Sequence, residues 1–553
     1  SGDVLVFRLS GMQTKQVKIK NQTTVNVALK PEIHTNQVPN TVYEDAAMKK
    51  EFMIRGASSV MAQRQKSGFG YHIRQFNREG YSTIHENNFK DAMKDPLSTF
   101  SIDVDAASYS NVRRFLNNGQ KPPVDAVRIE EMINYFTYDY EEPDNGHPFS
   151  INHEMAQCPW NDDNVLLHIG LQAEKIETDN MPPSNIVFLI DVSGSMNSYN
   201  KLPLLKKAFK LLVQQLREED RVAIVVYAGS SGLVLPSTQG IDKATILESL
   251  ERLQAGGSTA GAAGLELAYK VASENFIEEG NNRIILATDG DFNVGQSSDA
   301  EMERLIEKKR DQGVFISVLG FGTGNYQDSK MEIIADKGNG NYAYIDNILE
   351  EKKVLVNEFG GTMYTIAKDV KIQIEFNPAV VESYRLIGYE NRLLNDEDFA
   401  DDKKDAGELG SGHSVTALYE VRLARGDSPK ENTLKYQTAQ LNTKAKSGDE
   451  VATVKFRYKK PAGSRSTLLE QVIPYEKNYS MDMSENFKFS AAVAGFGMLL
   501  RDSDHKGAAS WQSVIDLAQS GKGTDEEGYR SEFIRLAKLA EQLDKVEMSG
   551  DVQ

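Results

Sequence analysis

An apolar run passes directly into a short polar turn at residues 186–196, which read IVFLIDVSGSM. The run Ile186–Ile190 has the length and the branched side chains of a buried β-strand. The turn that follows presents the carboxylate of Asp191 and the hydroxyls of Ser193 and Ser195. Because the carboxyl ends of parallel strands carry the ligand sites of open α/β sheets, we expect a functional site at this turn.

Strands and helices alternate around this stretch, from about residue 184 to residue 350. The expected strands are Ile186–Ile190, Val222–Tyr227, Arg283–Ala287, Val314–Gly320 and Asn341–Ile345. The expected helices are Leu202–Leu216, Lys243–Leu253, Ala262–Asn275, Ala300–Gln312 and Lys330–Lys337. Near-continuous apolar strands separated by amphipathic helices predict an α/β domain with a doubly wound, mostly parallel sheet.

Two further segments bring oxygen ligands to the same sheet edge. Gly256-Gly257-Ser258-Thr259 stands just before a helix, and the apolar strand that contains Ile284–Ala287 ends in Thr288-Asp289. The candidate metal ligands are Asp191, Ser193, Ser195, Thr259 and Asp289. Hard oxygen ligands of this kind suit Mg²⁺, with Mn²⁺ or Ca²⁺ as alternatives, rather than zinc or copper.

The charge of the five candidate ligands indicates what a bound metal could still bind. Only two of the five ligands are carboxylates, so a bound divalent cation keeps residual positive charge and an open coordination position. A carboxylate from another molecule is the natural occupant. The alternative is a set of helix caps with no metal.

Composition narrows the classes of function. The chain has 553 residues and a net charge of −17, which disfavours nucleic acid as a partner. No run approaches the ~18 apolar residues of a membrane span. Cys158 is the single cysteine, so no internal disulfide or cysteine-based metal site can form.

The segments on either side of the α/β domain are rich in strands. Expected strands are Phe100–Val104, two within 148–173, Val370–Phe376, Val415–Leu423, Glu450–Tyr458 and Thr467–Pro474. Expected helices are Ser108–Asn117, Val127–Phe136, one near Leu349–Ala367, Phe487–Leu500, Ala508–Gln519 and Glu526–Leu543. We therefore predict that the α/β domain is inserted in a β-rich flanking body, and that the chain ends in a helical tail.

The predicted domain organisation has six parts. Residues 1–30 form three short strands, and 31–88 form a linker with a short helix near Tyr43–Met53. Residues 89–183 are an N-terminal flanking segment, 184–350 the α/β domain, 351–475 a β-rich flanking segment and 476–553 the helical C-terminal region.

The three metal-ligand segments resemble the metal-ion-dependent adhesion site of the von Willebrand factor A domain. The family pattern D-x-S-x-S, a distant Thr and a distant Asp is matched by Asp191, Ser193, Ser195, Thr259 and Asp289. The resemblance implies that the serines and the threonine bind the metal through their hydroxyls and that the aspartates commonly act through water. It also implies a Rossmann-like fold, and adhesion to a protein partner rather than catalysis.

The flanks resemble a bacterial family in which an A domain is framed by its own N-terminal segment and a C-terminal domain of unknown function. The similar stretches include PLSTFSIDVDAASYSNVRRFLNNG (96–119) and FSAAVAGFGMLLRDSDHKGAASWQSVIDLA (489–518). Residues 1–30 are similar to the end of a carboxypeptidase-regulatory-like domain. The resemblance implies an exported protein of the cell envelope, periplasmic or surface-exposed, often a lipoprotein, and not an enzyme.

Several weaker motifs leave alternatives open. Asp103 and Asp105 lie at the end of an expected strand, as in metal-dependent phosphatases, but Ala107 stands where that motif has Thr or Val. A cap of the helix Ser108–Asn117 is the ordinary explanation of both. The acidic stretch 395–408 is either a solvated loop or a second cation site. Arg425-Gly426-Asp427 is an adhesion tripeptide or an ordinary turn, and His413 lacks a catalytic partner in sequence. The rivals to adhesion are a metal-dependent hydrolase or phosphatase that uses Asp103 and Asp105, and a purely structural envelope component.

Overall fold

The computed structural model describes fifteen stretches of the chain, and it divides the chain into two compact units. The described residues are 4–7, 15–18, 79–143, 146–177, 180–257, 261–290, 299–323, 326–358, 364–402, 404, 406–424, 441–446, 448–461, 463–476 and 478–550. The first unit is Ser1–Arg74 and the second is Gln75–Gln553. In the first unit, strands β1 (Val4–Phe7) and β2 (Lys15–Lys18) pair antiparallel. The third expected strand and the helix near Tyr43–Met53 lie outside the described residues.

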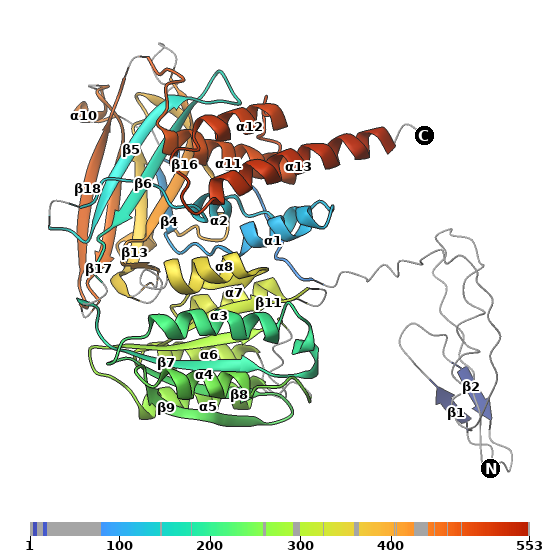
Figure 1. Cartoon of the computed structure of the whole chain (residues 1–553). Coiled ribbons are helices and arrows are strands. Elements are labelled where there is room, and N and C mark those ends of the chain that lie inside the picture. Colours follow the sequence, from blue (N-terminus) through green and yellow to red (C-terminus); the bar gives the residue numbers. More distant parts are fainter. Residues whose placement is uncertain are drawn as a thin grey trace, which may run out of the picture. The chain divides into compact units, whose positions relative to one another are not determined.

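The second unit contains the predicted α/β domain, referred to below as the A domain (Figure 1). Its six-stranded sheet has the order β12-β11-β10-β7-β8-β9 in the described part of the chain. All neighbouring strands are parallel except β9, which runs antiparallel to β8. The strand bounds are Ser184–Asp191 for β7, Arg221–Tyr227 for β8, Ser231–Gln239 for β9, Asn281–Thr288 for β10, Val314–Phe321 for β11 and Tyr342–Ile345 for β12.

Helices cover both faces of this sheet, which explains the continuous apolar strands. In β7, Ile186, Phe188 and Ile190 pack with α3 (Leu202–Gln215) and α4 (Lys243–Glu251). The alternate residues Val187 and Leu189 pack on the other face. The helices of that face are α5 (Gly261–Glu274), α6 (Asp299–Arg310) and α7 (Asp328–Lys337). Successive side chains of a strand point to opposite faces of the sheet. When helices cover both faces, every position of the strand is buried and the sequence is apolar throughout.

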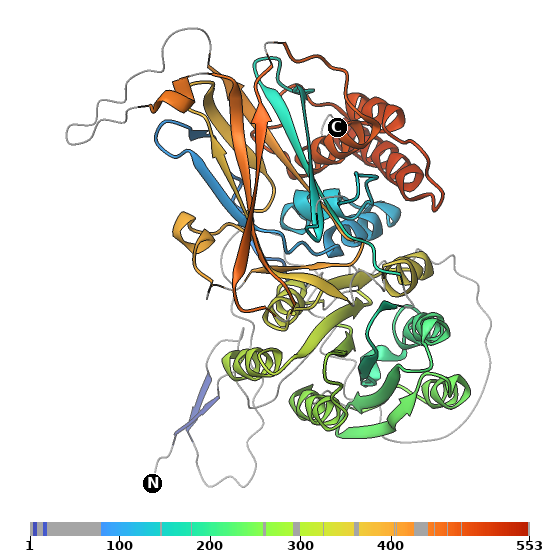
Figure 2. The same ribbon diagram turned by 90° about the vertical axis from the view of Figure 1, so that its left-hand side faces the viewer.

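The flanking body is a β-sandwich in which strands from both sides of the A domain pair with one another (Figure 2). One sheet has the order β15-β13-β17-β18, and β4 also pairs with β13. The other sheet has the order β3-β14-β16-β6-β5. The strands before the A domain are β3 (Lys90–Asp91), β4 (Leu97–Ser101), β5 (Phe149–Gln157) and β6 (Val165–Ala173). Those after it are β13 (Thr365–Phe376), β14 (Val381–Ile387), β15 (Gly407–Gly410), β16 (Ser414–Leu423), β17 (Glu450–Lys459) and β18 (Ser466–Pro474).

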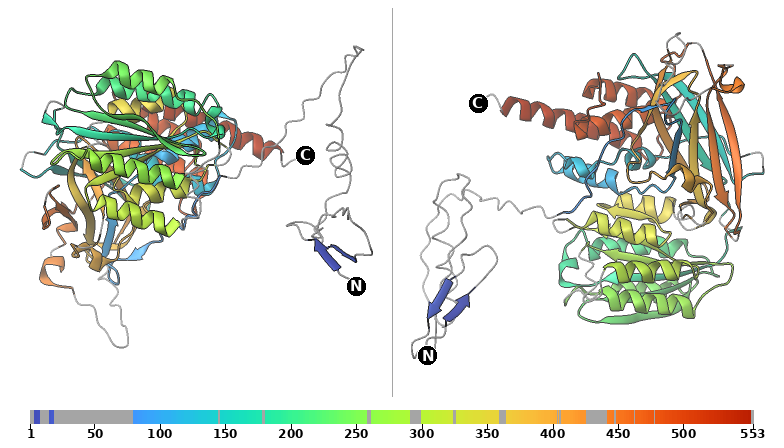
Figure 3. Two further views of the ribbon diagram at one scale, coloured as in Figure 1. Left: turned by 90° about the horizontal axis from the view of Figure 1, so that it is seen from below. Right: turned by 180° about the vertical axis from the view of Figure 1, so that it is seen from behind.

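A group of helices covers the outer face of the second sheet (Figure 3). Its members are α1 (Ala107–Asn117), α2 (Ile129–Asn134), α11 (Glu485–Arg501), α12 (Trp511–Ser520) and α13 (Tyr529–Gly550). Their apolar side chains pack with Leu166 of β6 and Leu418 of β16 in one buried cluster. The predicted fold class, a doubly wound domain inserted in a β-rich body with a helical tail, is therefore confirmed. No helix among the described residues is both long enough and apolar enough to span a membrane.

The structure differs from the sequence prediction in a few elements. The helix expected near Leu349–Ala367 is short, because α8 (Ile348–Lys352) runs into a π-helix at Lys353–Asn357 and strand β13 already begins at Thr365. Strands β9, β14 and β15 were not predicted. Residues 79–88, expected as the end of a linker, belong to the second unit, where Glu79 pairs with Arg114 at 2.8 Å.

One buried arginine joins three distant parts of the second unit. Arg113 of α1 pairs with Asp346 after β12 at 2.5 Å, with Glu350 of α8 at 2.7 Å and with Glu532 of α13 at 3.0 Å. The Arg113 side chain is only 2% exposed, and Asp346 and Glu350 are nearly as buried. The end of the A domain, the N-terminal flank and the C-terminal helices therefore share one charge cluster.

We expect Arg113→Ala to lower the free energy of unfolding by about 3–5 kcal/mol, since it leaves buried carboxylates without a counter-ion. Urea denaturation measures this loss. Arg252→Ala is the matched control, because Arg252 pairs with Glu248 on the surface and both side chains are more than half exposed. A loss in Arg113→Ala no larger than that in the control would contradict the structural role of this cluster.

Candidate metal centre

The turn after β7 gathers the first three predicted ligands. Asp191 ends β7 fully buried, and its Oδ1 accepts a hydrogen bond from the Ser193 amide at 2.8 Å. The hydroxyl oxygens of Ser193 and Ser195 lie 2.9 Å apart. Ser193 is buried and Ser195 is exposed, so the pair faces out of the sheet edge.

The glycine-rich segment lies against this turn. The Gly194 amide donates to the carbonyl of Gly257 at 3.1 Å, and the Gly256 amide donates to the carbonyl of Val192 at 2.7 Å. Thr259 itself lies outside the described residues. Gly257, the last described residue before Thr259, is therefore hydrogen-bonded to the turn that carries Asp191.

The second aspartate follows the neighbouring strand. Strands β7 and β10 are parallel, with Ile190 opposite Ala287, so Asp289 comes just beyond the level of Asp191. Asp289 is 5% exposed, and its Oδ2 accepts from the ammonium of Lys201 at 2.8 Å. The structure thus brings Asp191, Ser193, Ser195 and Asp289 to one edge of the sheet, as predicted from the sequence.

These residues fit a hard divalent cation. Oδ2 of Asp191 is enclosed and accepts no hydrogen bond of good geometry from the described residues, which leaves a buried anionic oxygen. Burial raises the pKa of Asp191 to about 6, and the amide and hydroxyl of Ser193 limit that rise. A cation beside this oxygen would restore the favourable electrostatics that burial removes.

Lys201 is a site residue that the sequence did not reveal. Its side chain is 13% exposed and lies directly before α3, where its ammonium supplies a single positive charge at Asp289. Lysines at the start of helices are common in surface turns, so nothing in the local pattern singled it out. A divalent cation bound beside Asp289 would have to tolerate or displace this ammonium.

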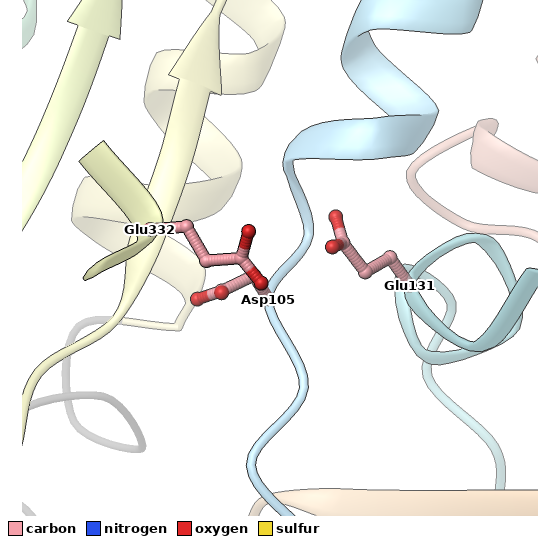
Figure 4. A group of neighbouring side chains, drawn as sticks. All are labelled: Asp105, Glu131 and Glu332. Carbon is pink, nitrogen blue, oxygen red and sulfur yellow. The ribbon is translucent and has the colours of Figure 1, made fainter. Parts of the chain in front are cut away.

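A second group of carboxylates lies at the base of α1 (Figure 4). Oxygens of Asp105, Glu131 and Glu332 all lie within 4.8 Å of one another, and all three side chains are buried. Arg128 pairs with Glu332 at 2.8 Å, and Arg392 pairs with Asp105 at 3.0 Å and with Glu332 at 3.3 Å. Two guanidinium groups therefore already neutralise much of this cluster.

The geometry of Asp105 argues against a nucleophile at this position. Its Oδ1 accepts from the Tyr342 amide at 2.9 Å, and its Oδ2 accepts from Arg392. A nucleophilic carboxylate needs an oxygen free to attack. The cluster instead connects α7 of the A domain, through Glu332, to the flanking body.

The remaining candidate residues occupy ordinary structural positions. Cys158 is buried and burial raises its pKa to about 12, which makes the thiol unreactive. His413 is half-buried, and burial lowers its pKa to about 4. In the acidic stretch, the carbonyls of Asp398 and Asp401 both accept from the ammonium of Lys371. Residues 425–427 lie outside the described residues.

Family models match most of the second unit. Residues 185–356 match the von Willebrand factor type A domain, and residues 75–168 match a model described as von Willebrand factor. Residues 361–543 match a model described as "Uncharacterized protein YfbK, C-terminal". The fold and these matches define a protein of the von Willebrand factor type A class, whose domains commonly bind a divalent cation and take part in protein–protein interaction.

The chain belongs to the family of the "Uncharacterized protein YfbK" of Escherichia coli (strain K12). The two are 46% identical over 477 residues, which cover 85% of this chain and 82% of the relative. The "Inter-alpha-trypsin inhibitor heavy chain H3" of Homo sapiens is 28% identical over 174 residues, 30% of this chain and 19% of that protein. Among solved structures, the von Willebrand factor type A from Catenulispora acidiphila is 18% identical with a TM-score of 0.41, and the match covers 69% of this chain and 88% of that one.

We expect Lys201→Met to strengthen Mg²⁺ binding about tenfold, because it removes a positive charge that repels the incoming cation. Asp191→Ala should abolish binding while the protein stays folded. Isothermal titration calorimetry measures both. Lys210→Met serves as the control, since Lys210 pairs with Glu251 on the surface. Unchanged Mg²⁺ affinity in Asp191→Ala would refute this location for the metal.

The buried carboxyl of Glu131 predicts a pH dependence. Burial raises its pKa from 4.5 to about 8, although Arg128 opposes the rise. The folded state therefore holds this proton more tightly, so its contribution to stability is full below pH 4.5 and is lost as the pH rises through about 8. We expect the stability of the wild type relative to Glu131→Gln to fall over that range in urea denaturation. A difference that is constant with pH would contradict the assignment.

Proposed function

We propose that this chain binds a protein partner through a divalent cation held by Asp191, Ser193, Ser195, Thr259 and Asp289. The gathering of the enclosed Asp191 carboxylate and the hydroxyls of Ser193 and Ser195 in one turn carries the proposal, because these hard oxygens are the ligand atoms that a divalent cation prefers. The cation is Mg²⁺, with Mn²⁺ and Ca²⁺ as alternatives, since all the ligand atoms are hard oxygens. The proposed domain bounds are those expected from the sequence, with the A domain at 184–350.

The charges around the site favour an acidic partner. Two carboxylates offset one divalent cation, and Lys201 adds a further positive charge at Asp289. The loaded site is therefore net positive, and an Asp or Glu side chain from the partner would gain a charge-assisted contact there. A positive site alone would also attract the phosphates of a nucleic acid. The net charge of −17 on the whole chain disfavours such a partner, so a protein ligand is favoured.

The surface beside the turn offers an apolar contact. Tyr199 follows the turn and is 87% exposed, although it is a large aromatic residue. Exposed tyrosines are frequent anchors in protein interfaces, because they bury large area with little loss of side-chain freedom. We propose Tyr199 as a contact residue beside the cation.

We place the protein in the cell envelope, periplasmic or surface-exposed, on the resemblance of its flanks to an exported family. A hydrolase that uses Asp103 and Asp105 has less support, since both oxygens of Asp105 are engaged within the protein. A purely structural role, in which the cation only stabilises the fold, would not account for the exposed Tyr199 beside the site.

The test is capture of envelope proteins on immobilised chain in Mg²⁺, with quantitative mass spectrometry as the readout. We expect one set of partners to be captured by the wild type and lost both with chelator and with Asp191→Ala. Tyr199→Ala should lower capture of the same partners while calorimetry shows unchanged Mg²⁺ affinity.

Asp242→Ala is the control, because Asp242 lies at the start of α4 outside the proposed ligand set. Capture that persists in chelator and in Asp191→Ala would overturn cation-dependent binding. Equal losses in the control variant would show that the effect is not specific to the site.

A further inference from the structure

A cavity of about 280 Å³ lies between the A domain and the flanking body. It is at the edge of the A-domain sheet where the strands begin, and Arg283 near the start of β10 is about 20 Å along the strand direction from Asp289. The A domain contributes Arg283, Asp336 and Asn339, and the body contributes Asp103, Thr365 and Glu408. The cavity is therefore separate from the proposed cation site.

Arg283 is the unusual residue of this cavity. It is 2% exposed, and its guanidinium makes one hydrogen bond, from Nη1 to the Ser317 hydroxyl at 2.8 Å. Nε is enclosed with no acceptor, and the group lies 5.5 Å from the centre of the Phe315 ring. Among the described residues Arg283 forms no ion pair, so Nη2 is left as the donor toward the cavity.

A buried guanidinium without a counter-ion is costly, since taking an ion out of water costs several kcal/mol. Burial lowers the pKa of Arg283 to about 10, and Glu408 offsets this only in part. Glu408 does not pair with Arg283 but accepts from Asn339 at 2.8 Å and from Thr365 at 2.6 Å. A residue whose burial is not compensated within the protein is a candidate for binding an external anion.

The other charged groups of the cavity differ from Arg283. Lys337 pairs with Glu307 at 2.9 Å, and Arg392 pairs with Asp336 at 2.6 Å. Asp103 is held only loosely, 3.8 Å from Arg392. The side chain of Asp103 is 27% exposed, so its carboxylate remains accessible. The carboxylate of Asp336 is engaged, because its Oδ2 accepts from Arg392 and its Oδ1 is enclosed.

We propose that this cavity binds a small amino acid, with its carboxylate on Arg283 and its ammonium toward Asp103. One cation without an ion pair and one accessible carboxylate in the same cavity call for a ligand that carries both charges. A phosphate dianion fits poorly, because three acidic side chains line the same space. The volume is at the low end for ligand sites, which limits the ligand to a small molecule.

The test is thermal denaturation of the full chain with a panel of the common amino acids, and with acetate, methylamine and phosphate for comparison. We expect saturable stabilisation by one or more small amino acids at millimolar concentration or below, and none by methylamine or phosphate. Arg283→Met should remove this stabilisation, and Glu248→Gln on the surface of α4 should leave it unchanged.

The ligand-free proteins provide a second readout. Arg283→Met should melt at or above the temperature of the wild type, because an uncompensated buried charge is replaced by an apolar side chain of similar length. A purely structural arginine would instead give a lower melting temperature. Should Arg283→Met fail to fold, Asp103→Asn keeps the volume and should weaken amino-acid binding about tenfold.

Three results would overturn the proposal. The first is the absence of stabilisation by every amino acid tested. The second is stabilisation by acetate equal to that by the amino acids, which would exclude a role for the ammonium group. The third is unchanged amino-acid binding in Arg283→Met.

Discussion

Buried ion pairs set the position of the A domain on its flanking body. Arg113 and Arg392 each lie at a junction between the two, and each meets several carboxylates at distances of 2.5 to 3.8 Å. Apolar contacts tolerate sliding, whereas a guanidinium–carboxylate pair is directional and fixes both partners. The cost of burying these charges is therefore balanced by a defined orientation between the inserted sheet and the sandwich. The cavity at the edge where the strands of that sheet begin depends on this arrangement, because both parts line it.

Much of the fold could be predicted from the sequence, because the central strands of the A domain are buried on both faces and leave an unmistakable apolar signal. Edge elements carried no such signal. β9 contains Pro236 and several exposed residues, so its pattern resembles a loop. The prediction of a helix near Leu349–Ala367 was wrong at its C-terminal end. Ile366 and Ala367 suit a helix or a strand equally, and pairing with other strands of the sandwich places them in a strand. Pairing between distant segments is tertiary information that local periodicity lacks.

The residues of the candidate sites were also predictable only in part. Asp191, Ser193 and Ser195 are adjacent in sequence, and the parallel register of β7 and β10 made the place of Asp289 predictable. Lys201 and Arg283 could not be found, because each resembles an ordinary charged residue at the border of a helix or a strand. Their significance lies in what surrounds them: a carboxylate at 2.8 Å for Lys201, and the lack of one among the described residues for Arg283. Such environments exist only after the chain has folded.

The interleaved sandwich has a consequence for how the protein is made. The side chain of Gln373 in β13 donates to Thr99 of β4, and the two residues are 274 positions apart. At ribosomal speed, β4 waits on the order of tens of seconds for its partner to be synthesised, while the A domain between them can already collapse. Strands β4, β5 and β6 spend that interval with unpaired edges, which are templates for aggregation. The N-terminal flank therefore completes its two sheets only after the whole A domain has been synthesised.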